Sequence, residues 1–294
     1  MLRLPAALVV SLVGAVPAAA QVSPTIESFA RTRTVRLGVA DDAPPFSWIG
    51  KDGTSIGYAV DLCRRVATDA AATIGWQVSE AGTPLPPRTI QLQFVHLQAA
   101  DEPGAIANGA VDLGCSALSP AQAAALSASP AVALSRTRLL AARLGDVSST
   151  GDLAGRTVAV VANTNAAARL AVVASTLSPH ARVQEVPGPG DGYELLATGA
   201  VDAFAADDLH LAGLLATRTD GPSFRIVGET LSEQPLALRF RADDPAFAAL
   251  VARSFRHMEA DGTLRALYLR WFTTAVPDGA SLDRPPPPAL LLGG

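Results

Sequence analysis

Predicted strands and helices alternate along this chain twice, in two series about 100 residues apart, and few folds accommodate such a pattern. Each series combines buried strands with helices whose apolar residues recur at helical spacing. The strands are predicted at 35–39, 90–97 and 111–118 in the first series and at 157–161, 183–186 and 201–205 in the second. Because this alternation is typical of α/β sheets, the sequence predicts two α/β lobes.

Two extended segments are expected to connect the lobes, one at 132–144 and the other near 233–238. The chain then returns to the first lobe through a helix that Asp244 caps and Pro245 opens. The first lobe is therefore predicted to contain residues 33–138 and 238–275, and the second lobe residues 139–237.

Three further segments are interpreted from their composition. Residues 24–33 are predicted to be a polar leader, and the alanine-rich segment 119–129 is predicted to begin as a helix. Residues 187–192, with the sequence PGPGDG, are predicted to be a loop because proline and glycine interrupt regular structure.

The N-terminus has the pattern of a cleaved secretory signal. Arg3 precedes an apolar run at 8–16, and Ala18-Ala19-Ala20 forms a small-residue cleavage site. We expect residues 1–20 to be removed after Ala20, which predicts a periplasmic protein; a buried N-terminal helix is the alternative. The proline-rich tail at 276–294 is predicted to be disordered.

Composition excludes several classes of function. The chain has 294 residues, of which 49% are hydrophobic and 17% charged, so it can bury a sizeable core. Its net charge of −4 disfavours a nucleic-acid partner. The sequence has no zinc-type Cys/His spacing and no phosphate-binding loop. We therefore predict a protein without cofactor or metal. We also expect it to be a monomer.

The two cysteines, Cys63 and Cys115, would meet an oxidising compartment after export. A bridge between them would close a loop of about 50 residues and stabilise the fold by about 4 kcal/mol. Two free buried thiols are the alternative.

The segment from Val35 to Ala67 points to a ligand. A predicted strand is followed by a turn-rich lip at 41–47, a turn at 51–53 and a helix that opens near Gly57. The lip leaves the C-terminal end of the strand, where open α/β sheets place their ligands. This arrangement favours a small-molecule receptor.

Several motifs, in order, resemble the periplasmic amino-acid-binding proteins of ABC importers. They are Ala43-Pro-Pro-Phe-Ser-Trp, Gly57-Tyr-Ala-Val-Asp-Leu-Cys, Gly109-Ala-Val-Asp-Leu-Gly-Cys, Asp152-Leu-Ala-Gly-Arg-Thr-Val-Ala-Val, Ala203-Phe-Ala-Ala-Asp-Asp and Asp261-Gly-Thr-Leu with Trp271-Phe272. The resemblance covers residues 33 to 277 and is nearest to the glutamate/aspartate-binding branch. It implies a type II periplasmic binding protein fold: two lobes, each a mixed sheet flanked by helices, with two crossover strands as hinge. It also implies a small-molecule ligand and a membrane permease as partner.

The resemblance implies roles for individual residues. Asp207 matches an aspartate that binds the ligand's ammonium group, while Thr164 and Asn165 match a helix start that binds a carboxylate. Helix capping is the alternative for Asp207 and Thr164. Phe46 and Trp48 could form an apolar wall or belong to the core. The ligand-binding residues that we predict are Phe46, Trp48, Ser119, Gln122, Thr164, Asn165 and Asp207.

The departures from the family pattern bear on the ligand. The carboxylate-binding arginine should fall at Gln122 or Ala124, and further cationic contacts are expected where this chain has Ala40 and Glu102. A histidine is expected near Pro189. Glutamine cannot replace the planar fork of arginine, and a buried carboxylate without a partner is costly. Acidic amino acids are therefore poor candidates, whereas an amine, a cationic compound or a neutral polar molecule fits better.

Three functions remain open from the sequence. The first is a receptor that delivers a polar solute, amino-acid-like or amine-bearing, to an ABC importer. The second is a dehydratase-like enzyme of the same fold, which we disfavour because the four histidines are isolated and no paired carboxylates are recognisable. The third is a periplasmic accessory protein that no longer binds an amino acid. We predict a non-enzymatic receptor.

Overall fold

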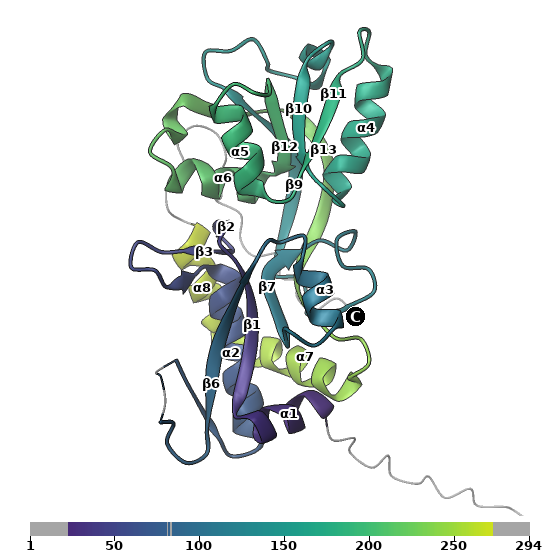
Figure 1. The fold of residues 1–294 in the computed structure, drawn as a ribbon. Helices are drawn as coiled ribbons and strands as arrows, with labels where there is room; N and C mark the ends of the chain where they lie inside the picture. Colours follow the sequence, from purple (N-terminus) through teal and green to yellow (C-terminus); the bar gives the residue numbers. More distant parts are fainter. Residues whose placement is uncertain (1–22, 81, 83, 273–294) are drawn as a thin grey trace, which may run out of the picture.

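The computed structural model describes residues 23–80, 82 and 84–272, which form two lobes stacked end to end (Figure 1). The predicted signal peptide at 1–20 and the predicted disordered tail at 276–294 lie outside the described residues. Within the described part, no helix combines the length and apolar character needed to cross a membrane.

Lobe one is built on parallel strands in the order β7-β1-β6-β5. Its helix α2 buries one side of nearly every turn, and α7 and α8 pack beside it in one hydrophobic core. The strands are β1 (Thr34–Ala40), β5 (Gln77–Ser79), β6 (Thr89–Leu97) and β7 (Leu113–Leu118), and the helices are α1 (Pro24–Thr32), α2 (Tyr58–Thr73), α3 (Glu102–Ala107), α7 (Pro245–Ala260) and α8 (Thr263–Phe272).

The predicted lip and the turn that follows it belong to a small antiparallel sheet at the top of lobe one. It consists of β2 (Asp42–Ala43), β3 (Ser47–Ile49) and β4 (Ser55–Ile56). Figure 1 shows β2 and β3 beside the gap between the lobes, below α5 and α6 of lobe two. The lip thus brings the end of lobe one against the opposite lobe.

Lobe two repeats the parallel arrangement, with helices on both faces of its sheet. The strands β10 (Thr157–Val161), β11 (Arg182–Val186) and β12 (Ala203–Asp207) are parallel and lie in the order β11-β10-β12. One hydrophobic cluster packs α4 (Asn165–Thr176) on one face, and a second packs α5 (Pro189–Ala197) and α6 (Asp208–Thr217) on the other.

Two long strands join the lobes into one ten-stranded sheet. They are β9 (Ala133–Ala142) and β13 (Phe224–Phe240), which pair antiparallel with each other. In lobe two β9 also pairs with β12, whereas in lobe one β13 pairs with β7 and with the short strand β8 (Ser127–Ala128). The predicted two-lobed mixed α/β fold with two crossing strands is confirmed.

The two cysteines form a disulfide between α2 and β7, with Cα atoms 6.1 Å apart. Both are fully buried in the core of lobe one. The bridge fastens α2 to β7, so the interpretation as free thiols is wrong.

Three of the segment predictions are wrong. Residues 24–32 form a helix rather than a leader, because the Ser23 hydroxyl accepts the Ile26 N–H and Phe29 packs on Phe247. Residues 120–126 form turns rather than a helix. The helix α5 begins at Pro189, inside the predicted loop, because Asp191 accepts the Gly188 N–H.

Candidate ligand-binding site

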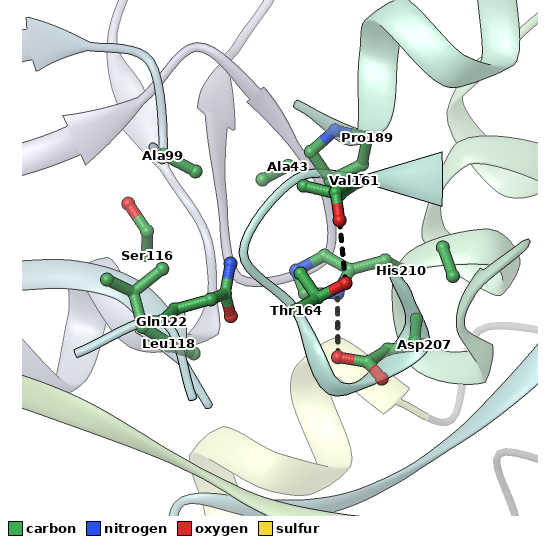
Figure 2. Close-up of a pocket in the computed structure, with 13 residues that line it drawn as sticks. Ala43, Ala99, Ser116, Leu118, Gln122, Val161, Thr164, Pro189, Asp207 and His210 are labelled. Atoms are coloured by element: carbon green, nitrogen blue, oxygen red, sulfur yellow. Dashed lines mark hydrogen bonds and ion pairs between the residues drawn. The ribbon is translucent and has the colours of Figure 1, made fainter. Parts of the chain in front are cut away.

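A pocket lies between the lobes at the C-terminal ends of β7, β10 and β12 (Figure 2). Including its mouth, which opens to solvent, it has an empty volume of about 460 Å³. Both lobes contribute, and small apolar side chains predominate. Its lining consists of Ala43, Ala99, Ser116, Ala117, Leu118, Gln122, Val161, Thr164, Ala166, Pro189, Ala206, Asp207 and His210.

Gln122 provides, beside Ser116, a polar side chain of the lobe-one wall. Its Oε1 accepts hydrogen bonds from the backbone N–H of Ser119, at 3.0 Å, and from the Ser119 hydroxyl, at 2.9 Å. Because a backbone N–H can only donate, the oxygen of the amide must face Ser119. Figure 2 shows the nitrogen on the opposite side, toward the space below Ala43 and Ala99. The side chain therefore offers N–H donors to a ligand.

The start of α4 forms the lobe-two wall opposite Gln122. Thr164 is the N-cap: its hydroxyl accepts the Ala167 N–H at 3.1 Å and donates to the Val161 carbonyl at 2.6 Å. The hydroxyl hydrogen is thus already used within the lobe. Thr164 lines the pocket with its backbone at the positive end of the helix, where a negatively polarised group is favoured.

Asp207, the last residue of β12, places a buried carboxylate in the pocket. Only 9% of the residue is exposed. Its hydrogen bonds come from Gln234 Nε2, at 3.1 Å to Oδ1 and 3.4 Å to Oδ2. Burial raises the pKa of Asp207 to about 7; the Gln234 hydrogen bond opposes this shift and the charge of Asp208 adds to it. Within the described residues, Asp207 has no lysine or arginine partner.

His210 also lines the pocket, contrary to our expectation of an isolated surface or packing residue. Its Nδ1 lies 3.9 Å from Asp207 Oδ2. Burial lowers the pKa of His210 to about 4, so the ring is neutral at physiological pH. The sequence contained a signal for this contact, because residues three apart at the start of a helix share one face.

The other predicted site residues lie outside the pocket lining. Phe46 is fully buried and packs against His210, Tyr58 and Phe272, and the half-buried Trp48 packs edge-on against Trp271. Ser119 is buried behind Gln122, and Asn165 is a half-buried first residue of α4. The structure therefore brings together Gln122, Thr164 and Asp207.

A second buried carboxylate lies directly behind the lobe-one wall. Glu102 is fully buried, and its Oε2 accepts the Ser116 hydroxyl at 2.6 Å and the Ser116 N–H at 3.2 Å. Burial raises the pKa of Glu102 to about 7, against the effect of the Ser116 hydrogen bonds and of Arg239. A side chain at Gly114 would overlap the carboxylate, so this glycine makes room for it. The wall is therefore backed by an acid where the resemblance led us to expect a cation.

The lip docks on lobe two at the rim of the pocket. The Phe46 and His210 rings lie 4.9 Å apart. Two glycines allow closer approach: a Cβ at Gly190 would overlap the Asp42 carboxylate, and a Cβ at Gly213 would overlap the Pro44 carbonyl. Burial and the nearby charge of Asp191 raise the pKa of Asp42. The structure is thus a closed form in which backbone of α5 and α6 meets the lip.

Replacing Gly213 with alanine is expected to oppose closure by about 1–3 kcal/mol, the usual cost of overpacking. The obstacle is backbone, which cannot rotate away as a side chain would. Alanine suits the middle of a helix better than glycine, so lobe two itself should not be destabilised. Small-angle X-ray scattering should give a larger radius of gyration for the variant. G104A is the matched control, since a Cβ there meets open space in α3. Scattering of G213A identical to wild type would contradict this docking.

Comparison with known proteins identifies relatives along nearly the whole chain. The L-glutamate/L-aspartate-binding protein of Pseudomonas aeruginosa is 25% identical over 283 residues, which cover 95% of this chain and 90% of that protein. The glutamate/aspartate import solute-binding protein of Escherichia coli is 23% identical over 276 residues, covering 92% and 87%. Both relatives are solute-binding proteins.

The fold has close counterparts among solved structures. A mutant of ArgBP from T. maritima matches 85% of this chain and 99% of its own with a TM-score of 0.70, at 18% sequence identity. At that identity the likeness concerns the fold. Residues 35–274 match the model of a family described as bacterial extracellular solute-binding proteins, family 3. With its two lobes, crossing strands and interlobe pocket, this chain belongs to the family 3 solute-binding proteins.

Proposed function

We propose that this protein is a periplasmic receptor for a small solute that carries a cationic amine, and that it delivers this solute to an ABC importer. The solute binds between the lobes as they close, with its amine at Asp207. The protein acts as a monomer and without catalysis, and residues 1–20 are removed on export. The import function of the Escherichia coli relative supports the delivery step.

The observation that carries the proposal is the buried Asp207 carboxylate. A buried carboxylate needs a cation or several hydrogen bonds to remain charged. In the described part of the chain, its partners are one glutamine amide and a neutral histidine. The pocket wall opposite is uncharged and consists of apolar residues with Ser116 and Gln122. A cation supplied by the ligand would satisfy Asp207.

The lobe-one wall bears on the remainder of the ligand. An uncharged amide at Gln122 and the helix start at Thr164 can bind a carbonyl or hydroxyl oxygen, but they lack the paired charged donors of an arginine. Glu102 behind the wall adds negative charge when it is ionised. A second carboxylate on the ligand is therefore disfavoured. These contacts suit an amine, an amino-acid amide or a basic compound better than glutamate or aspartate.

The experiment is thermal unfolding of the mature protein against a panel of solutes. The panel should contain acidic, neutral and basic amino acids, polyamines, organic acids and sugars. A ligand present at about 100 times its dissociation constant stabilises the folded state by about 2.7 kcal/mol, so binding is visible as a rise in Tm. We expect the rise with amine-bearing solutes that have no second carboxylate.

Three outcomes would contradict the proposal. A rise with glutamate or aspartate would mean that the missing arginine does not exclude acidic ligands. A rise confined to organic acids or sugars would remove the role of Asp207 as a cation partner. No rise with any solute on a well-folded sample would favour an accessory protein that has lost its ligand.

A further inference from the structure

The two aspartates at the end of β12, Asp207 and Asp208, are hydrogen-bonded to the two crossing strands. Asp207 accepts hydrogen bonds from Gln234 on β13, and Asp208 accepts the Ser135 hydroxyl at 3.2 Å and the Arg136 N–H at 3.0 Å on β9. Gln234 and Ser135 are direct neighbours in the register of β9 and β13. The Asp207 carboxylate, which is the proposed cation-binding group, is therefore held at the position where Gln234 of β13 pairs with Ser135 of β9.

The contact between Gln234 and Asp207 is buried on both sides. Gln234 is 4% exposed and Asp207 is 9% exposed. One amide nitrogen lies within hydrogen-bonding distance of both carboxylate oxygens. Since an ionised carboxylate only accepts hydrogen bonds, the amide must present its nitrogen to it. The bond holds the carboxylate at the edge of the pocket, where Figure 2 shows Asp207 below Thr164 and His210.

Little else in the surroundings favours the charged form of Asp207. The titratable groups that face it are Asp208 and His210, both on α6. The first is a like charge and the second is neutral because burial lowers its pKa. From β13 comes the Gln234 amide, and the pocket wall at α4 contributes the uncharged Thr164. Among the residues that the structure describes, the contact that lowers the pKa of Asp207 is the hydrogen bond from Gln234.

We propose that Gln234 is a positioning residue of the ligand site: its amide favours the ionised form of the Asp207 carboxyl and holds it toward the pocket, ready for the ligand's amine. This inference rests on the proposed function and deepens it, because it assigns to the second crossing strand a part in cation recognition. Gln234 is 27 residues from Asp207 in sequence, and within the described part of the chain its side-chain hydrogen bonds reach no other residue of the pocket lining. Its influence on a ligand passes through Asp207.

The test is a pH titration of the Asp207 carboxyl carbon by 13C NMR in the ligand-free mature protein, assigned with D207N. In Q234M, which removes the amide at nearly constant volume, we expect the midpoint to move upward by about one to two pH units. That shift corresponds to one lost hydrogen bond to a charged group. The matched control is Q93M on an exposed face of β6, which should leave the midpoint unchanged.

An unmoved midpoint in folded Q234M would overturn the proposal, because a purely structural glutamine would change the melting temperature and leave the titration alone. If Q234M does not fold, Q234N serves as the second variant: it retains an amide but withdraws it by one methylene. It should raise the midpoint in the same direction, and an unchanged midpoint there would also overturn the assignment.

Methylammonium, a minimal cation, tests the proposed function separately. Its addition to wild-type protein should lower the Asp207 midpoint, since a bound cation favours the carboxylate. A midpoint that methylammonium does not change, together with a midpoint raised in Q234M, would contradict cation binding while confirming the role of Gln234. The two ideas can therefore fail independently.

Discussion

Replacing Cys63 and Cys115 together with alanine is expected to lower the free energy of unfolding by about 4 kcal/mol. The bridge joins residues 52 apart in sequence and ties α2 to β7. In the chain-entropy account, its loss gives the unfolded chain the freedom of that loop, while the folded contacts change little. For a protein of this size, the loss corresponds to a Tm about 10 °C lower.

Urea unfolding of the double variant, with wild-type protein in reductant as the comparison, measures this effect. The reduced wild type should unfold close to the double variant, since both lack the covalent link. Equal midpoints for the variant and the oxidised wild type would mean that the bridge adds nothing to stability. The exposed ion pair Arg241–Asp243 gives a control, because D243N leaves both cysteines in place and surface ion pairs contribute little.

The fold could be predicted because its signals are local. The buried strand β1, the lip and the helix α2 follow directly from the apolar periodicity and turn residues between Val35 and Ala67. The error at residues 24–32 occurred where tertiary contacts decide. Helix α1 has a polar composition, but it is fixed by packing of Phe29, and Ser23 bonds to Asp244 more than 200 residues away.

The same division holds for the site. Asp207 and Thr164 stand at a strand end and a helix start that the sequence marks, whereas Gln122 was found through the resemblance, at the position of the expected arginine. Phe46 could equally have been wall or core, and only its packing against Tyr58 and Phe272 decides between them. The place of His210 in the pocket lining was not predicted, because it follows only once Asp207 is known to face the ligand.

The contacts between the lobes lay beyond sequence reasoning altogether. Gly213 sits within α6, where a glycine usually weakens a helix, and nothing near it in sequence explains it. Its reason is the carbonyl of Pro44 in the opposite lobe. The role of Gln234 on β13 could not be predicted either, because its partner Asp207 lies on another strand, 27 residues earlier in the sequence.

Asp207→Asn is expected to have opposite effects on stability and on binding. In the ligand-free protein above pH 7, the variant should be more stable than wild type by a few kcal/mol, at roughly 1.4 kcal/mol for each unit of pKa shift. Asparagine has the same shape and can still accept the Gln234 hydrogen bond, but it carries no charge to desolvate. For any amine-bearing ligand, the variant should bind at least about 30-fold more weakly, because the buried charge partner is gone.

The pH dependence fixes the sign of this prediction. Burial raises the pKa of Asp207 from 3.8 to about 7, so the folded state binds the proton more tightly than the unfolded state does. The carboxyl therefore costs wild type no stability below about pH 4, and its cost grows as the pH rises to about 7. D207N does not have this pH-dependent cost. The stability difference between the two proteins should therefore widen from about pH 4 to about pH 7 and remain constant above pH 7. Glu102 titrates in the same range in both proteins and cancels from the difference.

Urea unfolding at pH 4, 5.5, 7 and 8 measures this stability difference between D207N and wild type. A difference that stays flat with pH would mean that Asp207 is not held charged in a buried site, whereas a widening difference together with lost amine binding would identify a carboxylate kept for its ligand at the expense of stability.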